Sequence, residues 1–390
     1  MWHDPNGEEK SQAFDTKVMA VRHANAIETD SARGQYVDPK AGQVRFADLA
    51  ARWLASRIVD PNTAIKYESS LRLHVNPVFG RRQLGSIKPS EIATWVADLE
   101  SRFGPGTARN AFIVLNGPLE LAVDDEAIKR NPATAGSVRI PIPRVKKVAV
   151  WADEVVLRIV EEHPASYRPI PIVGAAAGLR QGELFGLAEE DIDFDEEVIH
   201  VRRQVKKLGK HLIFALPKND KERTVPMSEG AAEVLRAHIG ETEPRPHTLP
   251  WERVDGPPLT VKLLFRWRDD LEIHARGYDE YVWKPALAHA GVIPMPTRNA
   301  RHDLKYVTNR DVGMHALRHY YASVSLADGV NIKELAEYLG HTDPGFTLRL
   351  YTHLLPSSHE RSRKAIDNRL SPLFSIAADG TDTELGLPGL

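Results

Sequence analysis

The sequence predicts a mainly α-helical protein with a small antiparallel β-sheet, in which a helical half precedes an α+β half. Apolar residues recur at spacings of three and four through residues 45–136, which is the period of amphipathic helices. The string RIPIPRVKK at 139–147 then disfavours both a helix and a central strand, because it contains two prolines. Three strand-like runs follow among further helical patterns, at 198–205, 211–216 and 223–227.

Length and composition exclude several classes of protein. The chain has 390 residues, enough for two or three domains, and its 42% hydrophobic and 27% charged residues are ordinary for a globular protein. It contains no cysteine, which excludes a disulfide scaffold, a thiolate zinc site, an iron–sulfur cluster and a cysteine nucleophile. The apolar stretch Pro169–Leu179 is too short to span a bilayer, and the N-terminus resembles no secretory signal. We expect a cytoplasmic protein without a membrane segment.

Charge is distributed unevenly along the chain. The formal net charge is −2, which by itself disfavours a nucleic-acid-binding protein. Residues 41–150, however, carry 16 Lys and Arg against 10 Asp and Glu, whereas residues 371–390 carry three acidic residues and no basic one. The near-neutral total therefore conceals a basic interior segment. The acidic, Gly-rich tail after Pro372 is expected to be disordered or loosely docked.

The first 136 residues are expected to form one small hairpin and a series of helices. Asp4-Pro5-Asn6-Gly7 is a turn signal whose flanks can pair as strands. Asp15 is a candidate N-cap for the helix that follows, through Glu28. Four or five short helices are expected between residues 45 and 136, and Thr107 is the candidate cap of one of them.

Residues 150–370 combine helices with the three strands. Helical patterns cover Ala152–His163 and Tyr167–Leu187. Turn-like segments at Lys206–Lys210 and Lys218–Glu222 join the strands. Two loop-rich intervals lie farther along the chain, at Glu241–Pro258 and Pro294–Asp311.

The first motif that could carry chemistry is GLRQGELFGL, at Gly178–Leu187. It is not a dinucleotide-binding loop, because the glycine spacing is not GxGxxG and no strand precedes it. Arg180 is expected at a helix boundary, with Glu183 one turn later to hold it. On this motif alone, a surface ion pair is the simpler interpretation.

The second motif is MHALRHYYASVSL, in which His315 and Arg318 share a helix face at a spacing of three. His315 and His319 are four residues apart, as are zinc ligands on a helix. Ala316, however, stands where the zinc-protease helix needs a glutamate, and no third ligand is evident. A metal site is therefore disfavoured.

The third motif is YLGHTDPGFTLRLYTHL, which begins at Tyr338. Its Gly340-His341 pair follows a helix that Asn331 is expected to cap, and Tyr351 lies ten residues after His341 in the next expected helix. A single tyrosine is more often a packing residue than a nucleophile. Three other tyrosines compete for a chemical role, namely Tyr320, Tyr321 and Tyr338.

Taken together, the motifs resemble the tyrosine recombinase, or phage integrase, family over most of the chain, from about Arg45 to Leu370. The family has an arginine, a hairpin lysine, His-x-x-Arg, Gly-His and a tyrosine in that order. The matching residues are Arg180, Lys218, His315, Arg318, His341 and Tyr351, with Lys221 as the nearby alternative to Lys218. The family often has nine residues from the Gly-His histidine to the tyrosine, and this chain has ten. The string Tyr351-Thr352-His353 nevertheless matches the family's string around its nucleophile.

The resemblance implies that DNA strands are cut and rejoined through a covalent 3′-phosphotyrosine. Tyr351 would be the nucleophile, and Lys218 the general acid for the leaving 5′-oxygen. Arg180 and Arg318 would hold the non-bridging phosphate oxygens, because the guanidinium fork matches them. Since these side chains supply the positive charge, no metal or other cofactor is expected.

Further roles are implied for three residues. His315 and His341 would donate to the phosphate or assist proton transfer, and Glu183 would orient Arg180. Six cations are expected on the DNA backbone, namely Arg81, Arg82, Arg139, Arg144, Lys146 and Lys147. On composition alone, the linker that carries four of them is more simply a solvated connector.

The resemblance also implies a C-shaped clamp around DNA. The expected segments are a shortened arm-type DNA-binding module at 1–40, a helical core-binding domain at 41–138, a basic linker at 139–149, a catalytic domain at 150–370 and an acidic tail at 371–390. The implied partners are double-stranded attachment sites, three further copies in a homotetrameric synapse, a host DNA-bending factor and an excisionase. The arm-like module favours an integrase of a phage or integrative element.

Four other functions remain open at this point. They are a catalytically silent DNA-binding regulator of the same fold, a chromosome-dimer resolving recombinase, a type IB topoisomerase and a metallohydrolase built on His315 and His319. The regulator is disfavoured because every catalytic position of the family is filled, and the topoisomerase would not need the arm-like module.

Overall fold

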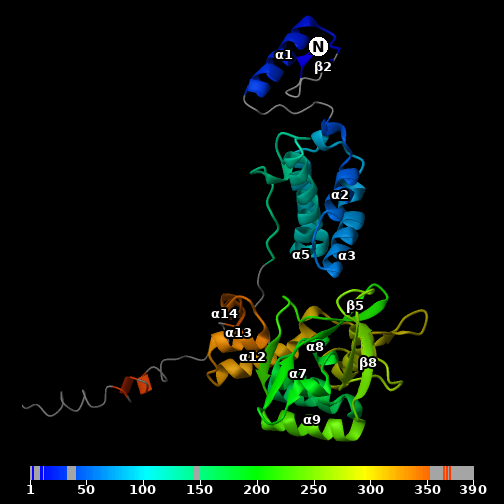
Figure 1. The fold of residues 1–390 in the computed structure, drawn as a ribbon, viewed down its shortest axis with the longest axis vertical. Coiled ribbons are helices and arrows are strands. Elements are labelled where there is room, and N and C mark those ends of the chain that lie inside the picture. The colour runs from blue at the N-terminus through cyan, green and yellow to red at the C-terminus, as the bar shows by residue number, and fades with distance from the viewer. Residues whose placement is uncertain are drawn as a thin grey trace, which may run out of the picture. The chain divides into compact units, whose positions relative to one another are not determined.

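The computed structural model describes residues 2–3, 9–11, 13–32, 41–143 and 150–351, together with 363–364, 366–367 and 369 (Figure 1). The chain divides into two compact units, Met1–Arg144 and Val145–Leu390. Among the described residues, no helix combines the length and the apolar character that crossing a membrane requires. The expected turn at Asp4–Gly7 and the tail after Pro372 lie outside the described residues.

The first unit begins with a short hairpin and a helix. Strands β1 (Trp2–His3) and β2 (Glu9–Lys10) pair in antiparallel fashion, which confirms the expected hairpin. Helix α1 spans Lys17–Ala32, so it ends four residues later than expected. The expected cap at Asp15 is wrong, because it is the Thr16 hydroxyl that accepts the Met19 N–H at 3.3 Å.

Four α-helices of the first unit follow in the described part of the chain, namely α2 (Phe46–Ala55), α3 (Pro61–Ser70), α4 (Asn76–Phe79) and α5 (Pro89–Asp124). The expected helix start at Thr107 is wrong, because α5 contains this residue. The break in α5 lies earlier, at Gly104, whose φ of 79° is a conformation that favours glycine.

Helices α2 and α3 pack along α5 and enclose the core of this unit (Figure 1). The Phe79 and Trp95 rings meet edge to face at 5.3 Å, and the Trp95 indole N–H donates to the carbonyl of His74 at 3.2 Å. A Cβ at Gly117 would lie 2.4 Å from the ring of Trp53, so only glycine allows α2 to approach α5 this closely.

The α-helices of the second unit are α6 (Asp153–Glu161), α7 (Pro169–Ala177), α8 (Gln181–Phe185), α9 (Glu229–Thr242), α10 (Ala275–Tyr278), α11 (Lys284–His289), α12 (His315–Ala327), α13 (Ile332–Leu339) and α14 (Pro344–Tyr351). The expected continuous helix over Tyr167–Leu187 is wrong. It breaks at Gly178, where φ is 62° and a Cβ would lie 2.4 Å from the ring of Tyr321.

Helix α7 lies at the centre of the second unit, in contact with α6, α8, α9 and α12 (Figure 1). Its sequence, PIPIVGAAA, is apolar on every side, which is why the helix is buried. Helices α12, α13 and α14 enclose a smaller apolar cluster that includes Leu326, Leu339 and Tyr351. This packing brings the second and third sequence motifs together.

The strands of the second unit are β3 (Ile192–Asp193), β4 (Val198–Val201), β5 (Gln204–Leu208), β6 (His211–Ala215), β7 (Arg223–Pro226), β8 (Arg245–Pro250), β9 (Pro258–Leu263), β10 (Thr297–Arg298) and β11 (Leu304–Lys305). They form small antiparallel sheets in the orders β3-β4-β7, β5-β6, β8-β9 and β10-β11.

Three expectations about these strands are wrong. The run 198–205 is two strands, because Arg203 turns inward to pair with the buried Asp191 at 2.6 Å and interrupts the ladder. The turn expected over Lys206–Lys210 is correspondingly shorter, since Leu208 pairs with His211. The loop-rich interval 241–258 contains strand β8. Its buried and exposed residues alternate, but the prolines near both of its ends disfavour a strand in the sequence.

Candidate active site

Arg180 lies at the junction between α7 and α8, at the expected helix boundary. Its backbone is extended, so it caps α8, and its N–H donates to Glu183 Oε2 at 2.8 Å. Its guanidinium donates to Glu183 Oε1 at 2.8 Å and to the carbonyl of Gly340 at 3.3 Å. The Glu183 side chain is fully buried, so the alternative of a surface ion pair is wrong.

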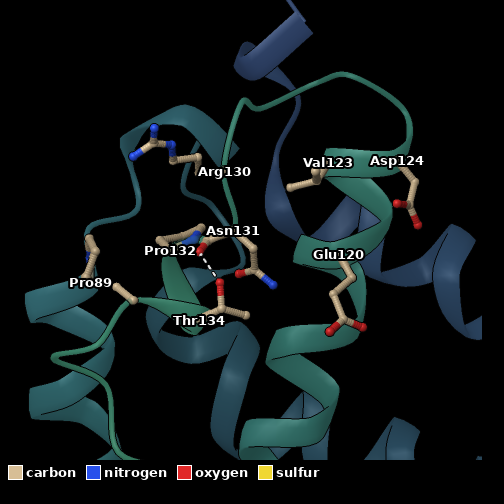
Figure 2. Close-up of a pocket in the computed structure, with 9 residues that line it drawn as sticks. Pro89, Glu120, Val123, Asp124, Arg130, Asn131, Pro132 and Thr134 are labelled. Carbon is tan, nitrogen blue, oxygen red and sulfur yellow. Dashed lines mark hydrogen bonds between the residues drawn. The ribbon is translucent and has the colours of Figure 1, made fainter. Parts of the chain in front are cut away.

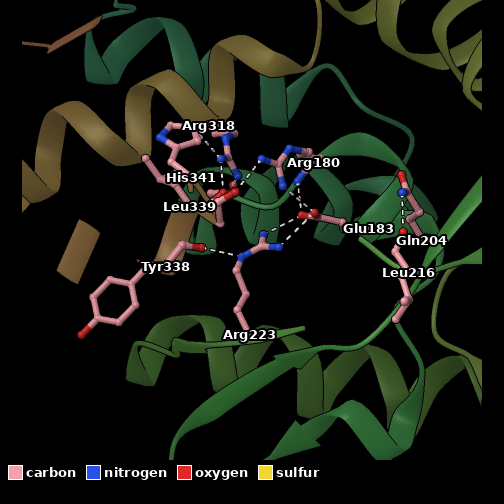
Figure 3. Close-up of polar contacts among 11 residues, drawn as sticks. Arg180, Glu183, Gln204, Leu216, Arg223, Arg318, Tyr338, Leu339 and His341 are labelled. Carbon is pink, nitrogen blue, oxygen red and sulfur yellow. Dashed lines mark hydrogen bonds and ion pairs between the residues drawn. The ribbon is translucent and has the colours of Figure 1, made fainter. Parts of the chain in front are cut away.

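Arg223 is a member of this cluster that the sequence analysis missed. Its guanidinium donates to both carboxylate oxygens of Glu183, at 2.9 and 2.6 Å, and its Nε donates to the carbonyl of Tyr338 at 2.6 Å (Figure 3). The two arginines hold the pKa of Glu183 down to about 2 in spite of its burial. One signal for Arg223 was available, since it lies on the same face of β7 as the buried Val225.

Arg318 lies on the first turn of α12 and is almost completely buried, with 1% of its surface exposed. It donates to the carbonyl of Gly178 at 2.9 Å, to the carbonyl of Leu339, and to Nε2 of His341 at 3.1 Å. Burial and the neighbouring charge of Arg180 lower the pKa of Arg318 to about 9. The guanidinium therefore stays charged at neutral pH and is held in one orientation.

The C-terminal end of α13 brings the three arginines together. The consecutive carbonyls of Tyr338, Leu339 and Gly340 each accept a hydrogen bond, and the donors are Arg223, Arg318 and Arg180 respectively (Figure 3). Helix ends expose carbonyls that lack an intrahelical partner and carry partial negative charge. The end of α13 therefore orients three cations that would otherwise repel one another.

His341 follows the left-handed Gly340 that ends α13. Its Nδ1 lies 2.7 Å from the hydroxyl of Thr347, a fully buried residue on α14. Because the Arg318 guanidinium only donates, Nε2 must accept, and the hydrogen must lie on Nδ1 and point to Thr347. Burial and the nearby arginines lower the pKa of His341 to about 3, so it is neutral at pH 7.

Tyr351 is the last residue of α14, and 1% of its surface is exposed. Its hydroxyl lies 2.7 Å from Nδ1 of His319, the residue after Arg318 on α12. The His319 ring meets the His315 ring edge to face at 4.7 Å. The structure thus brings Tyr351 to the helix that carries His315 and Arg318, as the motif order required. His319 itself was considered in the sequence only as a metal ligand.

Lys218 lies in the exposed loop between β6 and β7, where Asn219 and Asp220 both have positive φ. Desolvation, together with the neighbouring His319 and the charges of Arg318, Arg180 and Lys218, lowers the pKa of His315 to about 3, although part of the residue is exposed. The charge of Lys218 therefore acts on the site, while its side chain stays exposed. Lys221 is also exposed in this loop.

The electrostatic field of the site favours binding of an anion. Arg180 and Arg223 share the carboxylate of Glu183, Arg318 bonds to carbonyls and His341, and the histidines are neutral, so the cluster holds an excess of positive charge. The described residues include no group of three or more His, Asp or Glu that could hold a metal ion. The guanidiniums of Arg180 and Arg318, which meet at the end of α13, can bind a tetrahedral oxyanion through charge-assisted hydrogen bonds.

The first unit contains a cavity of about 740 Å³ near the ends of α5, which Figure 2 shows. Pro89, Val123 and Arg130 are among the residues that line it. Two of its polar groups bond to protein atoms: the Thr134 hydroxyl donates to the carbonyl of Asn131 at 3.0 Å, and the Asn131 amide donates to Asn116 at 2.8 Å. The arginine cluster, with its excess of positive charge, is the better candidate for the chemistry.

The expected DNA-binding cations differ in their exposure and in their hydrogen bonds to other protein groups. Arg81 and Arg139 are exposed, whereas the guanidinium of Arg82 bonds to Glu91 at 3.0 Å and to the carbonyl of Ser86 at 2.8 Å. The other three, Arg144, Lys146 and Lys147, lie outside the described residues.

Comparison with known protein families shows to which family this chain belongs. Residues 156–358 match the phage integrase family, and residues 45–100 match the N-terminal SAM-like domain of phage integrases. The chain belongs to the phage integrase family. It is a tyrosine recombinase, a site-specific integrase of the phage or mobile-element type, and it binds DNA. The resemblance and the fold class expected from the sequence are confirmed.

The integrase resembles known relatives over most of its length. It is 26% identical over 354 residues to a XerC-like tyrosine recombinase of Caldanaerobacter subterraneus, which covers 83% of both chains. It is 24% identical over 357 residues to a putative prophage phiRv2 integrase of Mycobacterium tuberculosis, covering 89% of this chain and 84% of that one.

Two solved structures share the fold of this integrase. The Tn1549 transposon integrase in complex with transposon right-end DNA has a TM-score of 0.64 at 20% identity, over 84% of this chain and all of the other. A λ integrase tetramer bound to a Holliday junction has a TM-score of 0.57 at 15% identity, over 88% and 93%.

Proposed function

We propose that this integrase cleaves DNA by forming a 3′-phosphotyrosine on Tyr351, with the scissile phosphate held between Arg180 and Arg318. The observation that carries the proposal is the meeting of both guanidiniums at the last carbonyls of α13, beside His341. The site holds excess positive charge before any DNA is present, and a phosphodiester supplies the matching negative charge.

The arginines act where charge develops. Attack on the phosphodiester increases negative charge on the non-bridging oxygens, and donors that are already oriented stabilise it without reorganisation. By analogy with oxyanion-hole donors, loss of one guanidinium raises the barrier by about 3–4 kcal/mol. Lysine does not replace Arg318 fully, because the three bonds of the guanidinium to Gly178, Leu339 and His341 define its plane.

The step conserves bond energy. The Tyr351 oxygen forms a bond to phosphorus, the bond from phosphorus to the 5′-oxygen breaks, and Lys218 gives that oxygen a proton. His315 assists by donating to the phosphate, and His341 acts through the Arg318 guanidinium that it contacts. Reversal of the step by another 5′-hydroxyl rejoins the strands, so neither a metal nor ATP takes part.

A nicked suicide substrate that carries the core site tests the proposal. We expect a denaturation-resistant protein–DNA adduct that forms in EDTA and is absent in Tyr351→Phe. Tyr338→Phe is the matched control, because the Tyr338 ring points away from the cluster (Figure 3). An adduct in Tyr351→Phe would overturn the choice of nucleophile, loss of activity in EDTA would favour the metallohydrolase, and no adduct in the unaltered protein would favour the silent regulator.

We also propose how the rest of the chain serves this reaction. Residues 41–138 and the linker 139–149 bind the DNA backbone through Arg81, Arg139, Arg144, Lys146 and Lys147. Arg82 chiefly forms an ion pair with Glu91. Residues 150–370 carry the chemistry, residues 1–40 form an arm-type module, and 371–390 an acidic tail. Four copies act in a synapse on attachment sites in the cytoplasm, with a DNA-bending factor and an excisionase as partners.

A further inference from the structure

The contact between His319 and Tyr351 is not used by the chemistry described so far. Nδ1 of His319 lies 2.7 Å from the tyrosine hydroxyl, and the two rings are 5.7 Å apart between centroids at an angle of 61°. The contact joins α12 to α14 across 32 positions of the chain, and the tyrosine is almost completely buried. His319 therefore touches the atom that the proposed reaction uses.

We propose that His319 is a catalytic residue that takes the phenolic proton of Tyr351 as the tyrosine attacks the scissile phosphate. The inference rests on the proposed function, because it requires Tyr351 to be the nucleophile. The proton passes from the Tyr351 oxygen to Nδ1 of His319 while the same oxygen bonds to phosphorus. The leaving 5′-oxygen takes a different proton, from Lys218, so each proton has one donor and one acceptor.

The protonation states at rest suit this transfer. Burial and the adjacent Arg318 lower the pKa of His319 to about 4, so its ring is neutral and can accept at pH 7. Burial raises the pKa of Tyr351 to about 12, so the free phenolate is scarce unless a base is in contact. A neutral imidazole with its hydrogen on Nε2 presents a lone pair at Nδ1, toward the hydroxyl.

The groups that face His319 explain how DNA would activate it. His315 and Arg318 face it from α12, Asp311 from the 3₁₀ turn Arg310–Val312, and Tyr351 from α14. Arg318 disfavours an imidazolium, whereas Asp311 favours it. A phosphate bound to Arg318 offsets the first effect, so His319 becomes a stronger base when substrate is in place.

The other histidines of the site are less suited to this role. Both ring nitrogens of His341 are engaged, with Arg318 and with Thr347. His315 meets the ring of His319 at 4.7 Å and supports its orientation. Among the hydrogen bonds of the described residues, the contact of His319 is the one made to the Tyr351 hydroxyl.

Two substitutions separate proton transfer from positioning. In His319→Asn, an amide oxygen can occupy the place of Nδ1 and accept the hydrogen bond, but it cannot take the proton. His319→Gln is the matched control, since its amide reaches toward the place of Nε2. We expect adduct formation by His319→Asn on the suicide substrate to be about 10²–10³-fold slower at pH 7, with unchanged affinity for DNA.

The pH profile gives the decisive measurement. We expect the single-turnover rate of the unaltered protein to be flat from pH 6.5 to 9, and that of His319→Asn to rise about tenfold per pH unit as hydroxide takes over. A more acidic fluorinated tyrosine at position 351 should restore most of the rate of His319→Asn. A rate for His319→Asn within about threefold of the unaltered protein would overturn the inference.

Two further results keep the test decisive. If His319→Asn does not fold, a tenfold rise per pH unit in the unaltered protein would overturn the inference by itself, and a flat profile would support it. If Tyr351→Phe still forms the adduct, the proposed nucleophile fails. If Tyr351→Phe forms none and His319→Asn keeps the full rate, only the role of His319 fails.

Discussion

Arg223 and Glu183 form a buried ion pair with two parallel hydrogen bonds, of 2.9 and 2.6 Å, in which 4% and 0% of the respective side chains are exposed. The same carboxylate also holds Arg180, so Glu183 connects strand β7 with the first turn of α8. Arg223 has its three nitrogens directed at protein acceptors. It is therefore a positioning residue, and its effect on the reaction passes through Glu183 and Arg180.

Replacing Arg223 by lysine tests this positioning role. Arg223→Lys keeps the charge but loses the fork and the bond to Tyr338, so we expect a loss of roughly 1–3 kcal/mol in the free energy of unfolding. Cleavage of the suicide substrate should fall as well, because Arg180 loses its fixed partner. Arg253→Lys is the control, since its pair with Asp255 is exposed and its loss should leave Tm unchanged. Equal effects of both variants would contradict the assignment.

Acid should remove the stabilisation that Glu183 provides. Its pKa falls from 4.5 to about 2 on folding, so its contribution is complete above pH 4.5 and is lost as the pH falls toward 2. The shift corresponds to roughly 3 kcal/mol. The gap in free energy of unfolding between the unaltered protein and Glu183→Gln should therefore narrow from pH 6 to pH 3 in urea titrations. Glu190→Gln, which alters an exposed carboxylate, is the control, and a pH-independent gap for Glu183→Gln would disprove the argument.

Thr347 should matter through its hydroxyl. Thr347→Val leaves the Nδ1 hydrogen of His341 without an acceptor in a buried place, which costs about 1–3 kcal/mol of stability. It should also slow cleavage, because the His341 ring loses a contact that holds its orientation beside Arg318. Thr347→Ser keeps the hydroxyl and should retain most of the activity. The measurements are thermal unfolding and single-turnover cleavage, and a fully active Thr347→Val protein would show that the contact is dispensable.

The role of Lys218 can be separated from that of Lys221 by the leaving group. Lys218→Ala should cleave an ordinary phosphodiester slowly, but a substrate with a 5′-bridging sulfur at a near-normal rate, because a thiolate leaves without a proton. Lys221→Ala should cleave both substrates normally. If sulfur rescues Lys221→Ala and leaves Lys218→Ala slow, the two lysines must exchange roles.

The two neighbouring arginines of the first unit should behave differently on DNA. Arg81 is exposed, so Arg81→Ala should weaken binding to all sequences and reduce the slope of log K against log salt by about one. Arg82 is bonded to Glu91 and Ser86, so Arg82→Ala should chiefly lower Tm. Salt titrations in a binding assay measure the first effect, and the reverse pattern would show that Arg82 faces the DNA.

Short-range relationships were predictable from the sequence, and long-range ones were not. Arg180 and Glu183 are three residues apart, so one helical turn was enough to predict their pairing. The pairing of Arg223 with Glu183 spans 40 positions and depends on how β7 meets α8. His319 fits a metal-ligand spacing in the sequence, and its contact with Tyr351 arises only from the packing of α14 on α12. The break in the helix at Gly178 could not be predicted either, because it depends on the Tyr321 ring that packs against this glycine.

The three arginines at the end of α13 have a consequence for the energy of the empty protein. Folding brings like charges together at a point where one carboxylate and three carbonyls only partly offset them. In the proposed function, a phosphodiester bound to this cluster supplies the negative charge that offsets the repulsion. By thermodynamic linkage, we therefore expect target DNA to stabilise the folded protein.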